Sequence, residues 1–204
     1  MGLWAIVPVK PLRRGKSRLS GVLNEDERAL LNYTMLGNTL RTLAEVPEID
    51  QILVVSRDPS ALALAREYGA RTVQEDGQPE LNTALRRATV VANMYAAQEI
   101  LIIPADLPLI SCKDIQSVIN LAAQPPVVVI APDRRNDGTN ALYMSPAGII
   151  EYHYGPGSYQ LHLEQAKRKG IRVEICHLTT LGLDLDLPED LDLLKQIEAL
   201  QIEP

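Results

Sequence analysis

The 204-residue chain carries a formal net charge of −6 at pH 7 and is 46% hydrophobic, without a single phenylalanine. This length suits one sizeable core, so we expect a single domain over residues 1–204. The acidic balance argues against a nucleic-acid or anionic-membrane surface, and no apolar run approaches the length of a membrane span. The two cysteines are far apart and lack metal-ligand spacing, which is typical of a reduced cytoplasmic protein.

Short apolar runs alternate with helical patterns along the chain. Their near-continuous hydrophobicity is typical of strands covered on both faces, as in a mainly parallel sheet. The alternation of strand and helix predicts a three-layer α/β/α sandwich around a mainly parallel, mixed sheet. The expected strands cover residues 3–9, 51–56, 100–104, 127–131, 141–145 and 171–178.

Capping residues predict where several helices begin, because their side chains can accept hydrogen bonds from the first free backbone amides. One of these helices is expected to run from a serine cap to Gly170. The expected start signals are Asn24, Asp58 with Pro59, Ser111 with Asp114, Ser158, and Pro188.

A basic loop follows the first expected strand. Residues 10–18 hold five Lys and Arg side chains and one glycine, but neither a Walker A nor a dinucleotide-binding pattern. A phosphate site needs hydrogen-bond donors and positive charge close together, and this loop offers both. The alternative is a solvated basic loop. The candidate phosphate-binding residues are Lys10, Lys16, Ser17 and Arg18.

Asp106 follows the expected strand at 100–104 and lies between Pro104 and Pro108. Each proline fixes its own φ and restricts the residue before it, so the chain around this carboxylate is stiff. Ligands of open α/β sheets bind beyond the carboxyl ends of the strands, which is where Asp106 is expected. The alternative is a turn in which Asp106 caps a neighbouring group.

Asp184 and Asp186 stand two positions apart in the segment LGLDLDLPEDL, residues 181–191. In an extended segment their side chains share a face, where they repel each other unless a cation lies between them. Mg²⁺ takes carboxylate and phosphate oxygens, and we expect it here. The alternative is a pair of turn or cap residues. Glu189 and Asp190 are expected to favour the N-terminus of the last helix through its dipole rather than to act as ligands.

Two further segments carry groups suited to binding an anion. Thr139 leads from a turn into the strand expected at 141–145. Gly155 lets the backbone approach a ligand, and Ser158 places a hydroxyl at a helix start. The alternatives are an ordinary turn at Thr139 and a simple N-cap at Ser158. The three histidines have no metal-ligand spacing.

Together these residues suit the transfer of a nucleotidyl group from a nucleoside triphosphate to a phosphorylated acid. The basic loop would hold the triphosphate, and Mg²⁺ on the three aspartates would neutralise the charge that develops on pyrophosphate. The phosphate oxygen of the acceptor is already ionised at pH 7. The reaction therefore needs positioning and electrostatics rather than a general base.

The segments WAIVPVK, GKSRL, LNTAL, PADLPL, APD with GTNAL, YGPGS and LDLDLPEDL follow one another along essentially the whole chain. In combination they resemble the 2-phospho-L-lactate guanylyltransferase family, also called phosphoenolpyruvate guanylyltransferase in some bacteria. The resemblance implies one nucleotidyltransferase domain with a fold like that of the nucleotide-diphospho-sugar transferases. It also implies that GMP passes from GTP to 2-phospho-L-lactate or phosphoenolpyruvate, with release of pyrophosphate, in coenzyme F-420 biosynthesis.

The resemblance also implies roles for individual residues, with Lys16 and Asp106 at the catalytic centre. Glu80 departs from the family pattern, in which a glycine is common at this position. The matched positions are Asp106, Asp184 and Asp186 for magnesium or manganese; Thr139, Gly155 and Ser158 for the phosphorylated acid; Lys10, Lys16, Ser17 and Arg18 for the triphosphate; and Asn82 near the nucleotide.

Two other functions compete with this one. A related nucleotidyltransferase could act on a sugar phosphate or molybdopterin, although the opening loop lacks the glycine-rich pattern that favours it. A non-catalytic nucleotide-binding module is the second alternative, and the intact Asp106, Asp184 and Asp186 argue against it. The expected partners are GTP and a phosphorylated three-carbon acid, with no nucleic acid and no membrane. A homodimer is a possible assembly, and the sequence does not separate the two acids.

Overall fold

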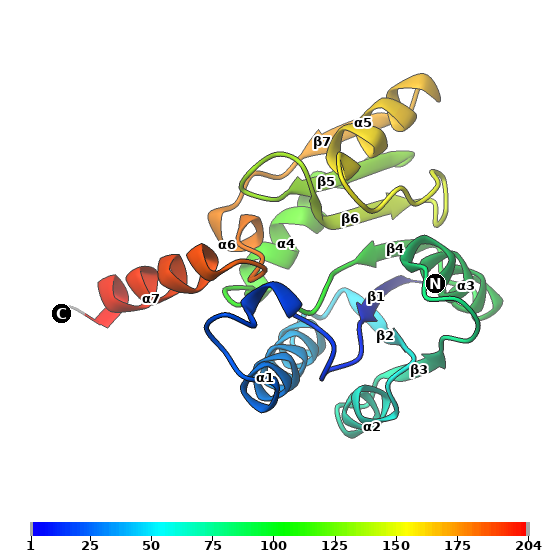
Figure 1. Cartoon of the computed structure of the whole chain (residues 1–204). Helices are drawn as coiled ribbons and strands as arrows, with labels where there is room; N and C mark the ends of the chain where they lie inside the picture. Colours follow the sequence, from blue (N-terminus) through cyan, green and yellow to red (C-terminus); the bar gives the residue numbers. More distant parts are fainter. Residues whose placement is uncertain (1, 203–204) are drawn as a thin grey trace.

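Seven strands form one sheet in the computed structural model, which describes residues 2–202 (Figure 1). They lie side by side in the order β3-β2-β1-β4-β6-β5-β7, and among the described residues only β6 runs antiparallel to its neighbours. The strands are β1 (Leu3–Val9), β2 (Ile49–Ser56), β3 (Arg71–Gln74), β4 (Glu99–Ile102), β5 (Val127–Pro132), β6 (Thr139–Ser145) and β7 (Arg172–Ile175).

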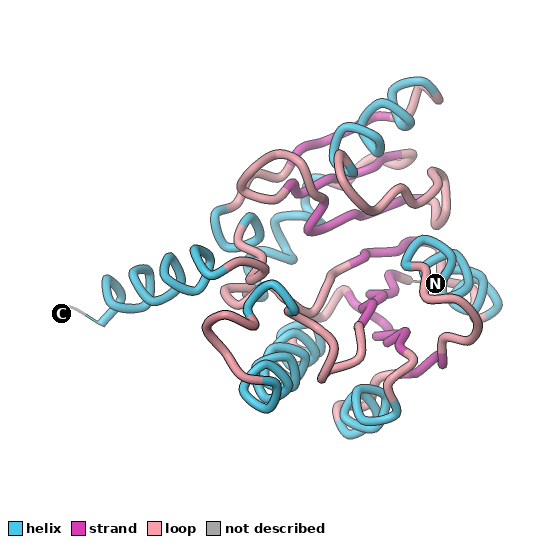
Figure 2. Tube along the Cα trace, in the orientation of Figure 1, coloured by secondary structure: helices cyan, strands magenta, loops and turns pink. Residues whose placement is uncertain are grey.

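Helices cover both faces of this sheet, so the expected three-layer sandwich is confirmed (Figure 2). One layer holds α1 (Glu25–Ala44), α2 (Pro59–Glu67) and α4 (Cys112–Leu121), and the other holds α3 (Leu81–Met94) and α5 (Ser158–Arg168). The remaining helices are the 3₁₀ turn η1 (Ser17–Leu19), α6 (Thr179–Gly182) and α7 (Pro188–Ile202). None of the helices within residues 2–202 combines the length and the apolar composition needed to cross a membrane.

Strand β1 shows why the apolar runs are continuous rather than alternating. Leu3, Ala5 and Val7 are buried against the α1 side, and Trp4 and Ile6 are buried against the α3 side. Successive side chains of a strand point to opposite faces, so burial on both faces requires apolar residues at every position.

All six expected strands are present, with ends within three residues of the predicted ones. The sequence did not predict β3, because this edge strand has four residues and is partly exposed, so it carries no buried apolar run. The caps at Asn24 and Asp58 and the capping box at Ser111 are confirmed, and α7 begins at Pro188. Asn24 also forms a capping box, with Glu27.

The predicted cap at Ser158 is wrong. Helix α5 begins with Ser158 as its first residue, and the cap is Gly157, whose φ of 71° lies in the left-handed region. Residues with a side chain rarely adopt this backbone conformation, which explains why position 157 is a glycine. The Ser158 hydroxyl is therefore free of a capping role, and its partner lies elsewhere.

The sheet topology brings the candidate residues to one edge. Asp106 follows β4, and the basic loop follows β1, which is parallel to β4. Strand β6 is antiparallel, so its first residue, Thr139, lies at the edge where the parallel strands end. This is the edge at which ligands of open α/β sheets bind.

Candidate active site

The three candidate metal carboxylates come together beyond β4. The amide of Leu185 donates a hydrogen bond to the carbonyl of Asp106, with a nitrogen–oxygen distance of 3.1 Å. The Leu185 side chain is fully buried in a small core with Leu19. Because Leu185 lies between Asp184 and Asp186, these contacts place both carboxylates next to Asp106.

Lys16 connects this group to the basic loop. Its Nζ lies 2.7 Å from Oδ2 of Asp106 and 3.0 Å from Oδ1 of Asp186, and its side chain is only 5% exposed. The backbone of Lys16 has φ 58°, which directs the side chain inward at some cost in backbone strain. Arg18 makes a longer, exposed contact of 3.5 Å with Asp186. The alternative of a solvated loop is thus wrong for Lys16, whereas Lys10, Ser17 and Arg18 are exposed.

The charges of the site shift its pKa values in opposite directions. Burial by itself disfavours the Lys16 ammonium, but the carboxylates of Asp106 and Asp186 outweigh burial and raise its pKa. Burial likewise opposes ionisation of Asp186, and Lys16 outweighs it, so the pKa of Asp186 is lowered. Asp184 has no such partner: burial and the charge of Asp106 raise its pKa. Asp184 is therefore the carboxylate that lacks a compensating cation.

The donor set suits a divalent cation, although the side chains are arranged around Lys16 rather than a metal. Within residues 2–202, no group of three or more His, Cys, Asp or Glu side chains is spaced to hold a metal ion. Oδ1 of Asp184, however, is buried without a hydrogen-bond partner. Buried polar atoms are nearly always paired, and three carboxylates with one orphaned oxygen fit Mg²⁺ or Mn²⁺.

Asp190, which the sequence analysis did not include in the site, supports this group from behind. Its carboxylate is fully buried and accepts hydrogen bonds from the backbone amides of Asp186 at 3.0 Å and Leu187 at 2.7 Å. Arg134 and Arg135 donate to the other oxygen at 2.7 and 3.0 Å. Burial disfavours the charge, but these donors outweigh it and lower the pKa of Asp190. Asp190 is the third residue of α7, which explains why it accepts from the amides just before the helix. The two arginines belong to the loop between β5 and β6, far away in the sequence.

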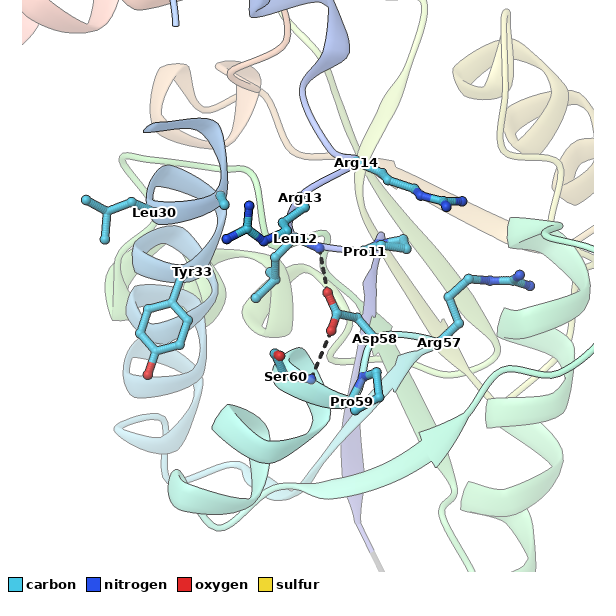
Figure 3. A pocket seen from close by; sticks show the side chains of 11 residues that line it. Pro11, Leu12, Arg13, Arg14, Leu30, Tyr33, Arg57, Asp58, Pro59 and Ser60 are labelled. Atoms are coloured by element: carbon cyan, nitrogen blue, oxygen red, sulfur yellow. Dashed lines mark hydrogen bonds between the residues drawn. The ribbon is translucent and has the colours of Figure 1, made fainter. Parts of the chain in front are cut away.

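A pocket of about 580 Å³ lies between the basic loop, α1 and the start of α2 (Figure 3). Its lining includes Arg13, Tyr33 and Arg57 but none of the predicted site residues. Within it, the carboxylate of Asp58 accepts hydrogen bonds from the amides of Leu12 at 2.7 Å and of the first turn of α2. Asp58 therefore caps a helix and at the same time fixes the loop that carries Lys16.

A second buried cluster joins Thr139, Ser158 and His162. The Ser158 hydroxyl donates to Oγ1 of Thr139 at 3.3 Å, and Nδ1 of His162 lies 3.0 Å from the same oxygen. All three residues are buried. Gly155 lies in the adjoining loop with φ 133° and open space beside its Cα, so the backbone there is accessible to a ligand. Of the residues predicted to hold the acid, two thus share one hydrogen-bond network.

Side chains from α3 and α5 hold the backbone of the loop before α5. The amide of Tyr154 donates to Oδ1 of Asn82 at 2.7 Å, and Nδ2 of Asn82 donates to the Tyr154 carbonyl at 3.1 Å. The amide of His153 donates to Nε2 of His162 at 2.9 Å. Glu80, which departs from the family pattern, caps α3 by accepting from the amides of Asn82 and Thr83. Asn82 thus fixes the backbone of the loop before α5 at Tyr154.

The loop between β5 and β6, residues 133–138, contacts both parts of the site. The amide of Arg134 donates to the Gly182 carbonyl at 2.8 Å, just before Asp184. On the other side, Oδ1 of Asp137 accepts from the amide of Gly157 at 3.2 Å. The 133–138 loop therefore connects the segment that carries Asp184 to the loop that leads into α5.

Solved structures of other proteins share this fold. A solved structure of a putative nucleotide-diphospho-sugar transferase from Desulfovibrio desulfuricans superposes with a TM-score of 0.78 at 18% identity, covering 97% of this chain and 88% of that one. Residues 3–196 match the family described as "Guanylyl transferase CofC like". The chain belongs to this family of guanylyltransferases.

Named relatives cover nearly the whole chain. A phosphoenolpyruvate guanylyltransferase of Rubrobacter xylanophilus is 40% identical over 204 residues, covering 100% of this chain and 98% of the relative. A 2-phospho-L-lactate guanylyltransferase of Methanocaldococcus infernus is 36% identical over 186 residues, covering 91% and 81%. The family resemblance and the fold expected from the sequence are thereby confirmed.

We expect Asp190→Asn to lower the free energy of unfolding by about 2–3 kcal/mol. The substitution replaces one of the two acceptor oxygens by an NH2 group, so the buried donors on one side of the side chain, either the arginines or the backbone amides, lose their acceptor. A hydrogen bond to a charged group contributes about 1.5–3 kcal/mol. Urea unfolding measures the change. Exposed Glu189 is the matched control, and Glu189→Gln should stay within about 0.5 kcal/mol of the wild type. Equal, small changes in the two variants would show that Asp190 is not a structural support.

The His162 cluster predicts a dependence of stability on pH. Burial, with a smaller contribution from His153, lowers the pKa of His162 to about 4. Below about pH 6.5 this histidine is protonated in the unfolded chain but stays neutral in the folded chain. The free energy of unfolding therefore falls by up to about 1.4 kcal/mol per pH unit until the pH nears 4. Urea unfolding between pH 7.5 and 4.5 should show a shallower decline in His162→Asn than in the wild type. Exposed His177 is the control, and curves that run parallel in wild type and His162→Asn would contradict the assignment.

Proposed function

We propose that the chain transfers GMP from GTP to phosphoenolpyruvate or 2-phospho-L-lactate, with release of pyrophosphate, in coenzyme F-420 biosynthesis. The observation that carries this proposal is the meeting of Lys16, Asp106 and the Asp184–Asp186 segment at the sheet edge that also holds Thr139 and its hydroxyl network. We assign the polyphosphate to the basic loop and the small acid to the hydroxyl network. The named relatives support these two acids as the first to test.

Asp106, Asp184 and Asp186 would hold Mg²⁺ or Mn²⁺. The unpaired, buried Oδ1 of Asp184 and its raised pKa support this assignment, because a cation removes both costs. A bound divalent cation would supply charge neutralisation for the triphosphate and for the pyrophosphate leaving group. The hydrogen bonds of Leu185 and Asp190 fix the backbone that carries these carboxylates, and the carboxylates would thereby be held in position for the cation.

The basic loop would bind the triphosphate. Lys10, Ser17 and Arg18 are exposed donors, and Lys16 can exchange its carboxylate partners for phosphate oxygens once a metal neutralises those carboxylates. Both side-chain groups of Asn82 are bonded to Tyr154, so its effect near the nucleotide would come through the position of that loop.

The chemical step needs no general base from the chain. A phosphate oxygen of the acid forms a bond to the α-phosphorus of GTP. The bond from that phosphorus to the oxygen that bridges the α- and β-phosphorus atoms breaks, so that pyrophosphate leaves with the electron pair. The acid's phosphate is already ionised at neutral pH. Lys16 and the other basic side chains would hold the reacting groups in line and stabilise the charge that moves to pyrophosphate.

Thr139 and Ser158 would form the site of the phosphorylated acid together with the backbone at Gly155, with Thr139 as the donor and Ser158 as the hydroxyl that donates to Thr139. Their hydroxyls lie within one network, and the open left-handed geometry of Gly155 leaves its amide approachable. The β5–β6 loop holds this region against the carboxylate segment, which supports a site with both substrates side by side.

A matrix of substrates tests the proposal. The purified chain is incubated with each of GTP, ATP, CTP and UTP, and with phosphoenolpyruvate, 2-phospho-L-lactate or 3-phosphoglycerate, in the presence of Mg²⁺. Pyrophosphate release and product mass should identify GTP with one of the first two acids. A product formed only with a sugar phosphate, or no product with any pair, would favour the related transferase or the non-catalytic module.

We expect Asp106→Asn to reduce turnover by at least about a hundredfold while the chain stays folded. Loss of one carboxylate removes several kcal/mol of charge stabilisation in the transition state. Turnover is measured at saturating GTP and acid, and Mn²⁺ binding is measured separately by electron paramagnetic resonance. Exposed Asp50 serves as the control, since Asp50→Asn should change neither quantity. Near wild-type turnover and Mn²⁺ affinity in Asp106→Asn would exclude Asp106 as a ligand.

We expect Thr139→Val and Ser158→Ala to weaken binding of the phosphorylated acid by roughly ten- to a hundredfold and to leave GTP binding unchanged. Thr139→Val removes a hydrogen bond to a charged group, worth about 1.5–3 kcal/mol. Ser158→Ala removes the hydroxyl that donates to Thr139 and so leaves the Thr139 hydrogen unoriented. Isothermal titration with each substrate measures the effect, and thermal melts report stability. Thr139→Ser keeps the hydroxyl and is the matched control. Equal weakening of both substrates, or a changed melting temperature with unchanged acid affinity, would remove these residues from the acid site.

A further inference from the structure

We propose that His162 is a positioning residue of the acid site: it orients the Thr139 hydroxyl so that this hydroxyl donates its hydrogen to an anionic oxygen of the phosphorylated acid. This inference rests on the proposed function and adds a residue that does not itself touch the substrate. His162 is completely buried, and neither the metal site nor the triphosphate loop uses it.

The tautomer of His162 follows from its two partners. The backbone amide of His153 lies 2.9 Å from Nε2 of His162, and a backbone amide can only donate. Nε2 is therefore the unprotonated nitrogen. Burial lowers the pKa of the ring far enough to keep it neutral at pH 7, so the single ring hydrogen is on Nδ1. Nδ1–H then donates to Oγ1 of Thr139, 3.0 Å away.

Thr139 receives a second hydrogen bond at the same oxygen. The Ser158 hydroxyl donates to Oγ1 of Thr139 at 3.3 Å. A hydroxyl has two acceptor positions and one hydrogen, so both acceptor positions are occupied. The Thr139 hydrogen must point away from both neighbours, and within residues 2–202 these two contacts are the side-chain hydrogen bonds of the Thr139 hydroxyl. Thr139 thus offers an oriented donor at the edge of the sheet that the site occupies.

An oriented neutral donor favours an anion without placing a fixed positive charge in the site. Thr139 is only 5% exposed, so little water competes for its hydrogen. The best partner is an ionised carboxylate or phosphate oxygen, which accepts hydrogen bonds and donates none. A phosphorylated acid supplies such oxygens, whereas a group that only donates would meet another donor.

Two substitutions separate the two functions of the imidazole ring. The side-chain nitrogen of Asn is as many bonds from Cβ as Nδ1 of His, and the terminal atoms of Gln are as many bonds from Cβ as Nε2. His162→Asn can therefore keep the donor to Thr139 and lose the acceptor for His153. His162→Gln can keep that acceptor and lose the donor. A purely structural role has no reason to distinguish the two in this direction.

We expect the Kd for phosphoenolpyruvate and 2-phospho-L-lactate to rise about tenfold or more in His162→Gln and by less than about threefold in His162→Asn. The Kd for GTP should be unchanged in both. Isothermal titration measures all three ligands, with thermal melts to verify folding. Equal losses in the two variants, or a larger loss in His162→Asn, would overturn the proposal.

Nitrogen-15 spectra of the wild-type imidazole groups test the premise without any substrate. The Nδ1–H tautomer is expected for His162, and an Nε2–H tautomer would overturn the proposal whatever the affinities are. If the wild type binds neither acid, the proposed function fails and this inference fails with it. If the wild type binds an acid and both variants bind it equally well, only the role of His162 fails.

Discussion

The contact of the Lys16 ammonium with Asp106 and Asp186 is the interaction on which the arrangement of this edge depends. Asp106 and Asp186 lie 90 and 170 positions from Lys16 in the chain, and the loops that carry the three residues meet at this contact and at the neighbouring contacts of Arg18 and Leu185. Without a cation, Asp106, Asp184 and Asp186 would repel one another. Lys16 is almost completely buried, so salt screens its attraction only weakly. The left-handed backbone of Lys16 costs about 1–2 kcal/mol, which the two ion pairs can offset.

The region proposed for the triphosphate and the region proposed for the acid differ in exposure and in charge. On the triphosphate side, Lys10 and Arg18 are exposed, which suits the attraction of a highly charged ligand from solution. On the acid side, Thr139, Ser158 and His162 are buried, uncharged and bonded to one another. Exposed charges bind any polyanion of similar size, whereas a buried network with fixed hydrogens discriminates by the geometry of acceptors. On the proposed assignment, selection of the smaller substrate depends on the part of the site that carries no net charge.

The sequence predicted the elements and residues whose signals are local. Strand β1 and the stretch from β4 to Asp106 were readable from continuous apolar runs and from prolines. The roles of Asp190 and His162 were not readable, because each depends on a partner far away: Arg134 lies 56 positions from Asp190, and Thr139 lies 23 from His162. A buried carboxylate at a helix start looks like a capping residue, and a lone histidine looks like a core residue. Only the sheet order, with its single reversed strand among the described residues, brings these pairs together.

The loop at residues 133–138 contacts both regions proposed to bind a substrate. Through Arg134 it contacts the segment that leads to Asp184, and through Asp137 it contacts the glycine before α5. With the nucleotide and the acid bound as proposed, a displacement of this loop on one side would change hydrogen bonds on the other and so link the two binding equilibria. Thermodynamic linkage then requires reciprocity: the factor by which the nucleotide changes the affinity for the acid equals the factor by which the acid changes the affinity for the nucleotide.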